Sequence, residues 1–216
     1  MSAFIALPLD DKIIIAADTI VTSRLADGGF TPIGFTSKIH PLIQKRAVIV
    51  GVGVMDLIVK WRDIANRCIL ASDILALNEY SPEAMRRYLL PEMPNSEEAY
   101  VCIYQMGFDL DGCIHCFKYD SADAFTSSPL PNNIFYRPGY SNVIENVEQT
   151  KNPFDYLFLM LECLKKNSEN ESPNHIGSIG GSMELAILTK YGFSTQIYKN
   201  FSDYDLSYQM ALSHCR

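Results

Sequence analysis

The sequence predicts an α+β protein in which antiparallel sheets carry helices on their outer faces. Strand patterns come first, and two helices, further strands, two more helices and final strands follow. Strands grouped in this way, without β-α-β alternation, favour antiparallel pairing. A four-layer αββα sandwich with two antiparallel sheets fits this order. Because the chain has 216 residues and no long linker, we expect a single domain spanning residues 1–216.

The first part of the chain is rich in strand patterns. The apolar runs 4–9 and 12–17 predict a strand, a turn and a second strand. Residues 21–34 include the turn-forming Asp27-Gly28-Gly29 and predict a loop or a loose hairpin. The β-branched and apolar run 46–54 predicts a buried strand.

Two helices are expected next. Apolar residues at helical spacing predict a first helix that begins at Asp56 and extends towards Leu77. Ser81-Pro82-Glu83 predicts the start of a second, because serine is a good N-cap and proline is accepted in the first turn. Pro91 is expected to end that second helix.

A hairpin is the clearest feature of the middle of the chain. The runs 100–108 and 113–119 flank Asp109-Leu110-Asp111-Gly112, a typical turn sequence between two strands. The proline-rich residues 127–133 predict a loop, and residues 141–148 predict a short helix.

The last third combines helices with a strand pair. Asn152-Pro153 predicts the start of a helix, which Lys165 and Lys166 are expected to close at the negative end of its dipole. Residues 183–189 and 193–198 predict two strands, and the tail 203–214 predicts a final helix.

Composition narrows the classes of function. The net charge is -7 and no lysine or arginine cluster occurs, so we expect no nucleic-acid partner. No apolar run approaches the roughly 20 residues that span a membrane, and no signal-peptide pattern is present, which favours a cytoplasmic protein. Cys113-Ile114-His115-Cys116 has no second pair at zinc spacing, so we expect no metal, and no cofactor motif occurs.

Three residues near the start suggest nucleophilic chemistry. Once Met1 is removed, Ser2 would carry a free amine that can act as general base for its own hydroxyl. Lys38 could lower the pKa of that amine by like-charge repulsion, and Asp18 could hold Lys38 in place. A plainer interpretation remains, in which Ser2 is an ordinary start, Asp18 caps a turn and Lys38 is a solvated lysine at a strand end.

The chain resembles proteasome-type β subunits, which belong to the N-terminal nucleophile hydrolases and include the bacterial two-component proteasome-like peptidase. The matching segments follow the order found in that family and cover nearly the whole chain. They are residues 6–18, Ser37-Lys38-Ile39, residues 51–56, residues 100–119 with their turn at 108–112, and residues 180–188 with Gly180-Gly181.

This resemblance implies a hydrolase that cleaves amide bonds in peptides. Ser2 would be the nucleophile in place of the more usual threonine, with Asp18 and Lys38 as its supporting pair. A backbone N–H of Gly51 or Gly53 would stabilise the oxyanion. Further polar residues near the nucleophile would assist it. The resemblance also implies assembly into a homo-oligomer and is compatible with a partner ATPase.

The accessory positions depart from the family pattern. Ser141, in Gly139-Tyr140-Ser141, resembles one accessory serine of the family. The accessory aspartate and second serine fall on Ile176 and Ile179, which cannot form side-chain hydrogen bonds; His175 and Ser178 are candidates to replace them. Two alternatives therefore stand beside the peptidase: a catalytically silent scaffold or binding subunit, and a small-molecule amidase.

Overall fold

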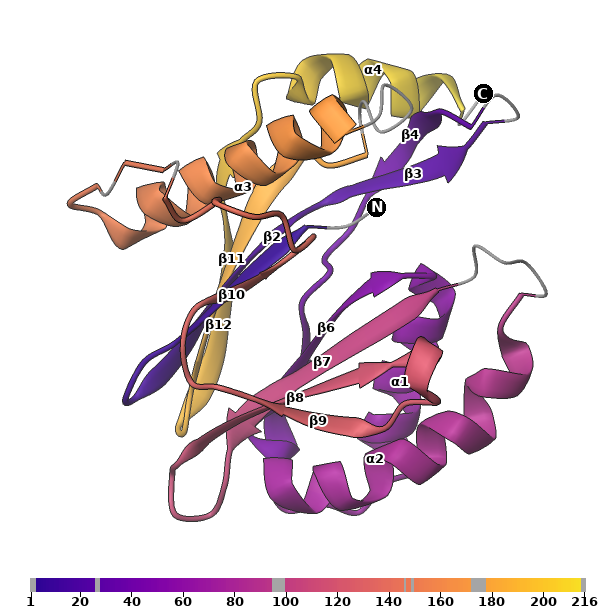
Figure 1. The fold of residues 1–216 in the computed structure, drawn as a ribbon, viewed down its shortest axis with the longest axis vertical. Coiled ribbons are helices and arrows are strands. Elements are labelled where there is room, and N and C mark those ends of the chain that lie inside the picture. Colours follow the sequence, from indigo (N-terminus) through magenta and orange to yellow (C-terminus); the bar gives the residue numbers. More distant parts are fainter. Residues whose placement is uncertain are drawn as a thin grey trace.

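A computed structural model describes residues 3–25, 28–94, 100–145, 147–148, 150–171 and 178–214. Within these residues the protein is α+β, with four α-helices and three antiparallel sheets of five, two and five strands (Figure 1). The α+β prediction is confirmed. Beside the two large antiparallel sheets, the segment between β2 and the second large sheet forms a small sheet of its own.

The first large sheet joins the beginning and the end of the described chain. Its strands have the order β10-β1-β2-β11-β12. They span Phe135–Arg137, Phe4–Pro8, Lys12–Asp18, Ser182–Thr189 and Gly192–Asn200. Since β2 pairs with β11, Asp18 lies opposite Met183 in the register. The end of β2 is thereby placed beside the Gly180-Gly181 turn that precedes β11.

The second large sheet has the order β5-β6-β7-β8-β9. Its strands span His40–Leu42, Ala47–Gly53, Val101–Phe108, Ile114–Asp120 and Ser127–Leu130. The β7–β8 hairpin confirms the prediction. The loop predicted at 127–133 is wrong in its first half, because β9 is an edge strand, where the missing N–H of Pro129 is tolerated.

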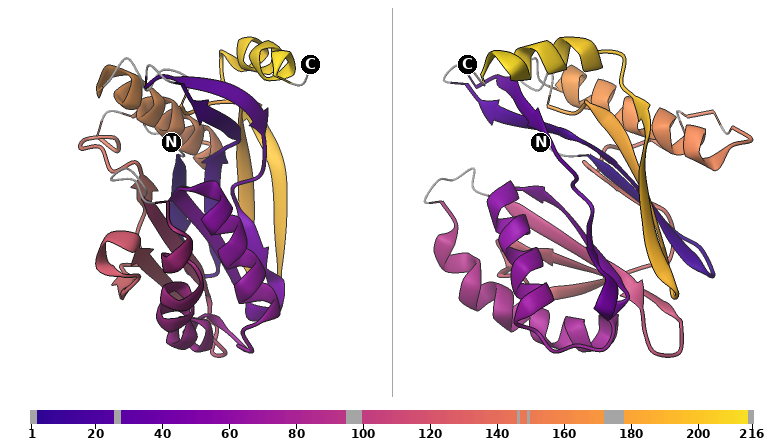
Figure 2. Two further views of the ribbon diagram at one scale, coloured as in Figure 1. Left: turned by 90° about the vertical axis from the view of Figure 1, so that its right-hand side faces the viewer. Right: turned by 180° about the vertical axis from the view of Figure 1, so that it is seen from behind.

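The two-stranded sheet lies where a loop or a loose hairpin was predicted, and it is a hairpin. It consists of β3, Ile20–Arg24, and β4, Phe30–Phe35. Helix α4, Tyr204–Ser213, confirms the predicted tail helix and lies alongside this hairpin in both views of Figure 2.

The two helices of the first half were predicted at the wrong boundaries. Helix α1 spans Met55–Arg67 and α2 spans Ile74–Tyr88. The α2 N-cap is Asp73, whose carboxylate accepts from the N–H of Ala76 at 2.9 Å, so Ser81-Pro82 lies inside the helix. The buried Ser81 hydroxyl donates to the carbonyl of Leu77 at 2.7 Å. The serine that resembles a cap is therefore used within the helix.

Helix α3 spans Pro153–Glu171 and starts where it was predicted to start. Its end at Lys165-Lys166 was predicted wrongly, because the helix continues for another turn and a half. Ser168 in that extension is buried, and Glu171 accepts a hydrogen bond from the Tyr140 hydroxyl at 3.0 Å. The helix predicted at 141–148 is absent from the described residues of that stretch, which form turns.

Buried side chains form three clusters. In the first, α1 and α2 pack on the second large sheet, as with Trp61 and Ile103. In the second, side chains of both large sheets meet, as with Ile15 and Tyr104. In the third, α3 packs on the first large sheet around Leu161. Figure 1 shows these helices beside their respective sheets. None of the helices in the described part of the chain is long and apolar enough to cross a membrane.

Candidate active site

A buried ion pair lies at the end of β2. The Nζ atom of Lys38, in the segment after β4, is 2.8 Å from both carboxylate oxygens of Asp18. Asp18 is fully buried and only 4% of Lys38 is exposed. Burial of an unpaired charge is costly, which accounts for their close pairing. Lys38 is thus not a solvated lysine, and that part of the plainer interpretation is wrong.

Asp18 also anchors two backbone segments. Its Oδ1 atom accepts from the N–H of Ala3 at 2.8 Å, and its Oδ2 atom accepts from the N–H of Gly180 at 3.2 Å. One carboxylate therefore connects the start of the described chain, the lysine and the turn before β11. Ser2 precedes Ala3 in the sequence but lies outside the described residues.

The Gly180-Gly181 turn is fitted closely to the end of β2. The carbonyl of Gly180 accepts from the N–H groups of Thr19 and Ile20, each at 3.2 Å. The Thr19 hydroxyl accepts from the N–H of Ser182 at 2.9 Å. Gly181 has a φ of 79°, and a Cβ atom there would come within 2.7 Å of the Thr19 hydroxyl. Both the backbone conformation and the close approach require glycine.

The sequence did not reveal the parts played by Thr19 and the Gly180 N–H. A backbone donor leaves no trace in the residue type, and a single threonine after a strand is not informative. The Gly-Gly pair was the available signal, and it marked the correct turn.

The accessory candidates before this turn have other partners. Ser178 is fully buried, and its hydroxyl oxygen is 3.4 Å from that of Ser168 in α3. Ile179 is buried in the apolar cluster beneath α3. No hydrogen bond described in the structure links Ser178 to the Asp18–Lys38 pair. His175 and Ile176 lie outside the described residues.

The two oxyanion candidates belong to β6. A Cβ atom at Gly51 would lie 2.8 Å from the Ile58 side chain. Gly53 has a φ of 104°, and a Cβ atom there would lie 1.9 Å from the carbonyl oxygen of Tyr100. Close packing at both positions, together with the positive φ of Gly53, therefore explains both glycines. The intervening Val52 packs against the cluster that contains Ala17 and Ile39, which are sequence neighbours of Asp18 and Lys38.

Ser141 is exposed in the turns that follow β10. It borders a hollow of about 310 Å³ together with Tyr140 and three residues near the end of α3: Asn167, Asn170 and Glu171. Among the described contacts, none joins Ser141 to Asp18 or Lys38.

The cysteine motif lies at the start of β8, which begins at Ile114. Cys113 is exposed, whereas Cys116 is buried. The ring of His115 interacts with the carboxylate of Asp109 at 2.8 Å, and this hydrogen bond lowers the pKa of Asp109. Within the described ranges, no group of three or more histidine, cysteine or acidic side chains could hold a metal ion.

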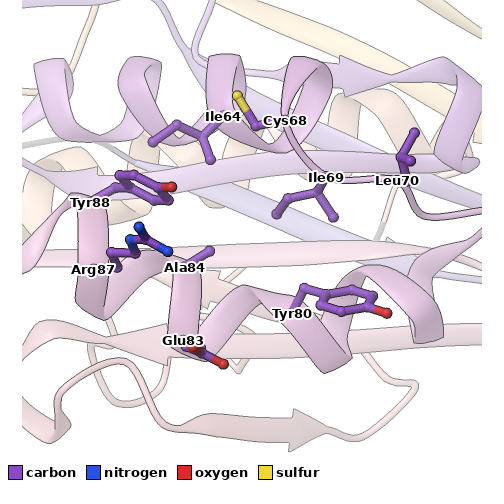
Figure 3. A pocket seen from close by; sticks show the side chains of 9 residues that line it. All are labelled: Ile64, Cys68, Ile69, Leu70, Tyr80, Glu83, Ala84, Arg87 and Tyr88. Atoms are coloured by element: carbon purple, nitrogen blue, oxygen red, sulfur yellow. The ribbon is translucent and has the colours of Figure 1, made fainter.

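Two hollows differ in whether their lining includes sequence neighbours of Asp18 and Lys38. One of about 430 Å³ lies between α1 and α2 and is lined by Ile64, Leu70 and Tyr88, among others (Figure 3). The other, of about 300 Å³, includes Thr19 and Ser37, which adjoin Asp18 and Lys38 in the sequence. We call this second hollow the Glu184 hollow, after the acidic residue that lines it.

Comparison of the chain with protein-family models and with curated proteins finds no match. Function is therefore inferred from the residues and their geometry.

Proposed function

We propose that this protein is an N-terminal nucleophile hydrolase that cleaves amide bonds in peptides, with Ser2 as the nucleophile after removal of Met1. The observation that carries the proposal is the buried Asp18–Lys38 pair, held at 2.8 Å and bound to the N–H of Ala3. A lysine so fully buried is unusual unless it has a structural or chemical task. The residue that follows Ser2 is thereby fastened to the pair.

The fold proposed for this function is a single-domain αββα sandwich of four layers. The three buried clusters support it, because they pair α1 and α2 with the second large sheet, the two large sheets with each other, and the first large sheet with α3. The β3–β4 hairpin then lies outside the layers as an added element.

In the proposed reaction, the neutral amine of Ser2 takes the proton from the Ser2 hydroxyl. The Oγ atom forms a bond to the substrate carbonyl carbon, and the amine returns the proton to the leaving nitrogen. Water then hydrolyses the ester formed with Ser2. The Lys38 ammonium favours the neutral amine by like-charge repulsion, which is stronger in a buried setting than in water.

The oxyanion formed during attack needs a hydrogen-bond donor. We propose a backbone N–H of Gly51 or Gly53, because Val52 between them packs against the cluster to which Ala17 and Ile39 belong. A donor of this kind contributes about 3 kcal/mol of transition-state stabilisation.

Covalent labelling tests the proposal. A β-lactone probe is incubated with protein from which Met1 has been removed, and intact mass with peptide mapping locates the adduct. We expect one adduct per chain on Ser2, loss of labelling in Ser2→Ala, and retention in Ser2→Thr, which keeps both amine and hydroxyl. Lys38→Met should slow labelling strongly, whereas Lys199→Met, an exposed lysine, should not.

One observation favours a catalytically silent scaffold as the second candidate. Ile179, at the position of the second accessory serine in the resembling family, is buried among apolar side chains and cannot orient an amine. If folded protein with a free Ser2 amine remains unlabelled, the scaffold is the better account. If labelling occurs, peptides and acylated small amides tested side by side separate the peptidase from a small-molecule amidase.

A further inference from the structure

The Glu184 hollow contains a carboxylate with one unused oxygen. Glu184, in β11, is only 6% exposed. Its Oε1 atom accepts from the hydroxyls of Ser37 and Thr195, each at 2.9 Å. Its Oε2 atom is buried and has no hydrogen-bond partner among the described residues. A buried acceptor without a donor is costly, so this oxygen is suited to a donor supplied by a ligand.

Aromatic rings form the wall of the same hollow. Phe35 and Tyr204 both line it, and their ring centroids are 5.3 Å apart. Tyr208 stacks near both rings, at centroid distances of 6.3 Å from Phe35 and 6.1 Å from Tyr204. The faces of aromatic rings attract cations, most strongly where water is excluded.

The Glu184 carboxylate and the aromatic rings together indicate the class of ligand. Glu184 disfavours an anion. Divalent metals such as calcium require six or more oxygen ligands, and the described residues contain no cluster of three acidic, histidine or cysteine side chains. A carboxylate beside aromatic rings instead suits an organic cation. Lys38, one residue from Ser37, cannot serve because it is bound to Asp18.

We propose that the Glu184 hollow binds a primary alkylammonium group, such as a lysine side chain or a free amine. The ammonium donates to Oε2 of Glu184, and its alkyl chain lies against Phe35, Tyr204 and Ile197. The volume of about 300 Å³ is at the small end of ligand pockets, which suits a short chain. Binding here requires neither Ser2 nor amide cleavage and is measured without either.

The test is a ligand-observed saturation-transfer NMR titration with n-butylammonium chloride at constant ionic strength. Neutral n-butanol and potassium chloride are the comparators. We expect saturable binding of n-butylammonium, much weaker binding of n-butanol, and little competition by potassium. If n-butanol binds as tightly as n-butylammonium, the site is only a hydrophobic hollow. If potassium competes as strongly as n-butylammonium binds, the site accepts cations in general. Either result overturns the proposal.

Variants locate the binding. Glu184→Gln should weaken n-butylammonium about tenfold or more, since it removes the charge from the accepting group. Glu83→Gln, the same change at an exposed residue of α2, should leave the affinity unchanged. Tyr204→Leu should weaken it about threefold, the loss expected for a cation–aromatic contact. Unchanged affinity in Glu184→Gln overturns the proposal; if that variant does not fold, unchanged affinity in Tyr204→Leu does so.

Discussion

Replacing Lys38 with methionine leaves Asp18 as a buried carboxylate without its cation. Breaking a buried ion pair by removing one partner typically costs about 3–5 kcal/mol of folding free energy. Asp18 would keep the N–H groups of Ala3 and Gly180 as donors, at 2.8 and 3.2 Å. We therefore expect a loss near the lower end, about 3 kcal/mol, which a domain with about 5–15 kcal/mol of stability can survive.

Urea unfolding at pH 7 measures this loss. Trp61 is the only tryptophan in the sequence and is fully buried, so its fluorescence reports unfolding of the cluster beneath α1 and α2. The matched control is Lys199→Met. Lys199 is 3.9 Å from Asp155, and these side chains are 55% and 42% exposed. An exposed pair of this kind contributes less than about 1 kcal/mol.

The double variant Asp18→Asn/Lys38→Met completes the cycle. Removing both charges abolishes the uncompensated carboxylate, so the double variant should be more stable than the sum of the single losses predicts. We expect a coupling free energy of about 2 kcal/mol or more, within the range for directly contacting charges. A Lys38→Met loss no larger than that of Lys199→Met, or strictly additive losses, would refute the idea of a tightly coupled buried pair.

Two further predictions concern the surroundings of the pair. Burial, and secondarily the charge of Arg62, lowers the pKa of His40 from 6.5 to about 4. As the pH falls, His40 takes up its proton in the unfolded chain before it does so in the folded protein. The stability that depends on neutral His40 is therefore complete above pH 6.5 and is lost as the pH falls towards 4, by up to about 3 kcal/mol. His40→Gln should flatten the urea-midpoint profile over that interval, and an unchanged slope would contradict the assignment. Gly181→Ala should cost more than about 1 kcal/mol in urea unfolding, because the backbone there has positive φ. Gly192→Ala, where an added Cβ meets nothing within 4 Å, is its control, and equal losses would count against the close fit.

The strand pattern of the sequence predicted much of the sheets. Buried strands such as β2 and β6 have long apolar runs, and the β7–β8 hairpin has a strong turn sequence. The short edge strands β5 and β10 have three residues each, too few for a pattern. They exist because longer neighbours offer them hydrogen bonds.

Helix boundaries were harder to predict where two signals compete. Asp73 and Ser81 are both good N-cap residues. The packing of Ile74 and Leu77 in the cluster between α1, α2 and the second large sheet decides between them. Proline within a helix costs about 3 kcal/mol, so a local reading favours Ser81, while tertiary packing outweighs that cost.

The site was predicted in part. Asp18 and Lys38 are 20 positions apart, and no spacing rule predicts their contact; their charges suggested it, the resemblance supported it, and the structure brings them together. The orphaned oxygen of Glu184 was not foreseen, because it results from β11, β12 and the segment before Lys38 meeting in space. A lone glutamate in a strand carries no sequence signal for this.

The most direct test of the proposed mechanism is an experimental structure of the protein with Met1 removed. The decisive quantity is the distance between the Ser2 hydroxyl oxygen and the Lys38 Nζ atom. We predict hydrogen-bond reach, about 2.6–3.2 Å and somewhat longer without substrate. A Ser2 hydroxyl directed into solvent, with Lys38 still bound to Asp18, would contradict the proposed nucleophile.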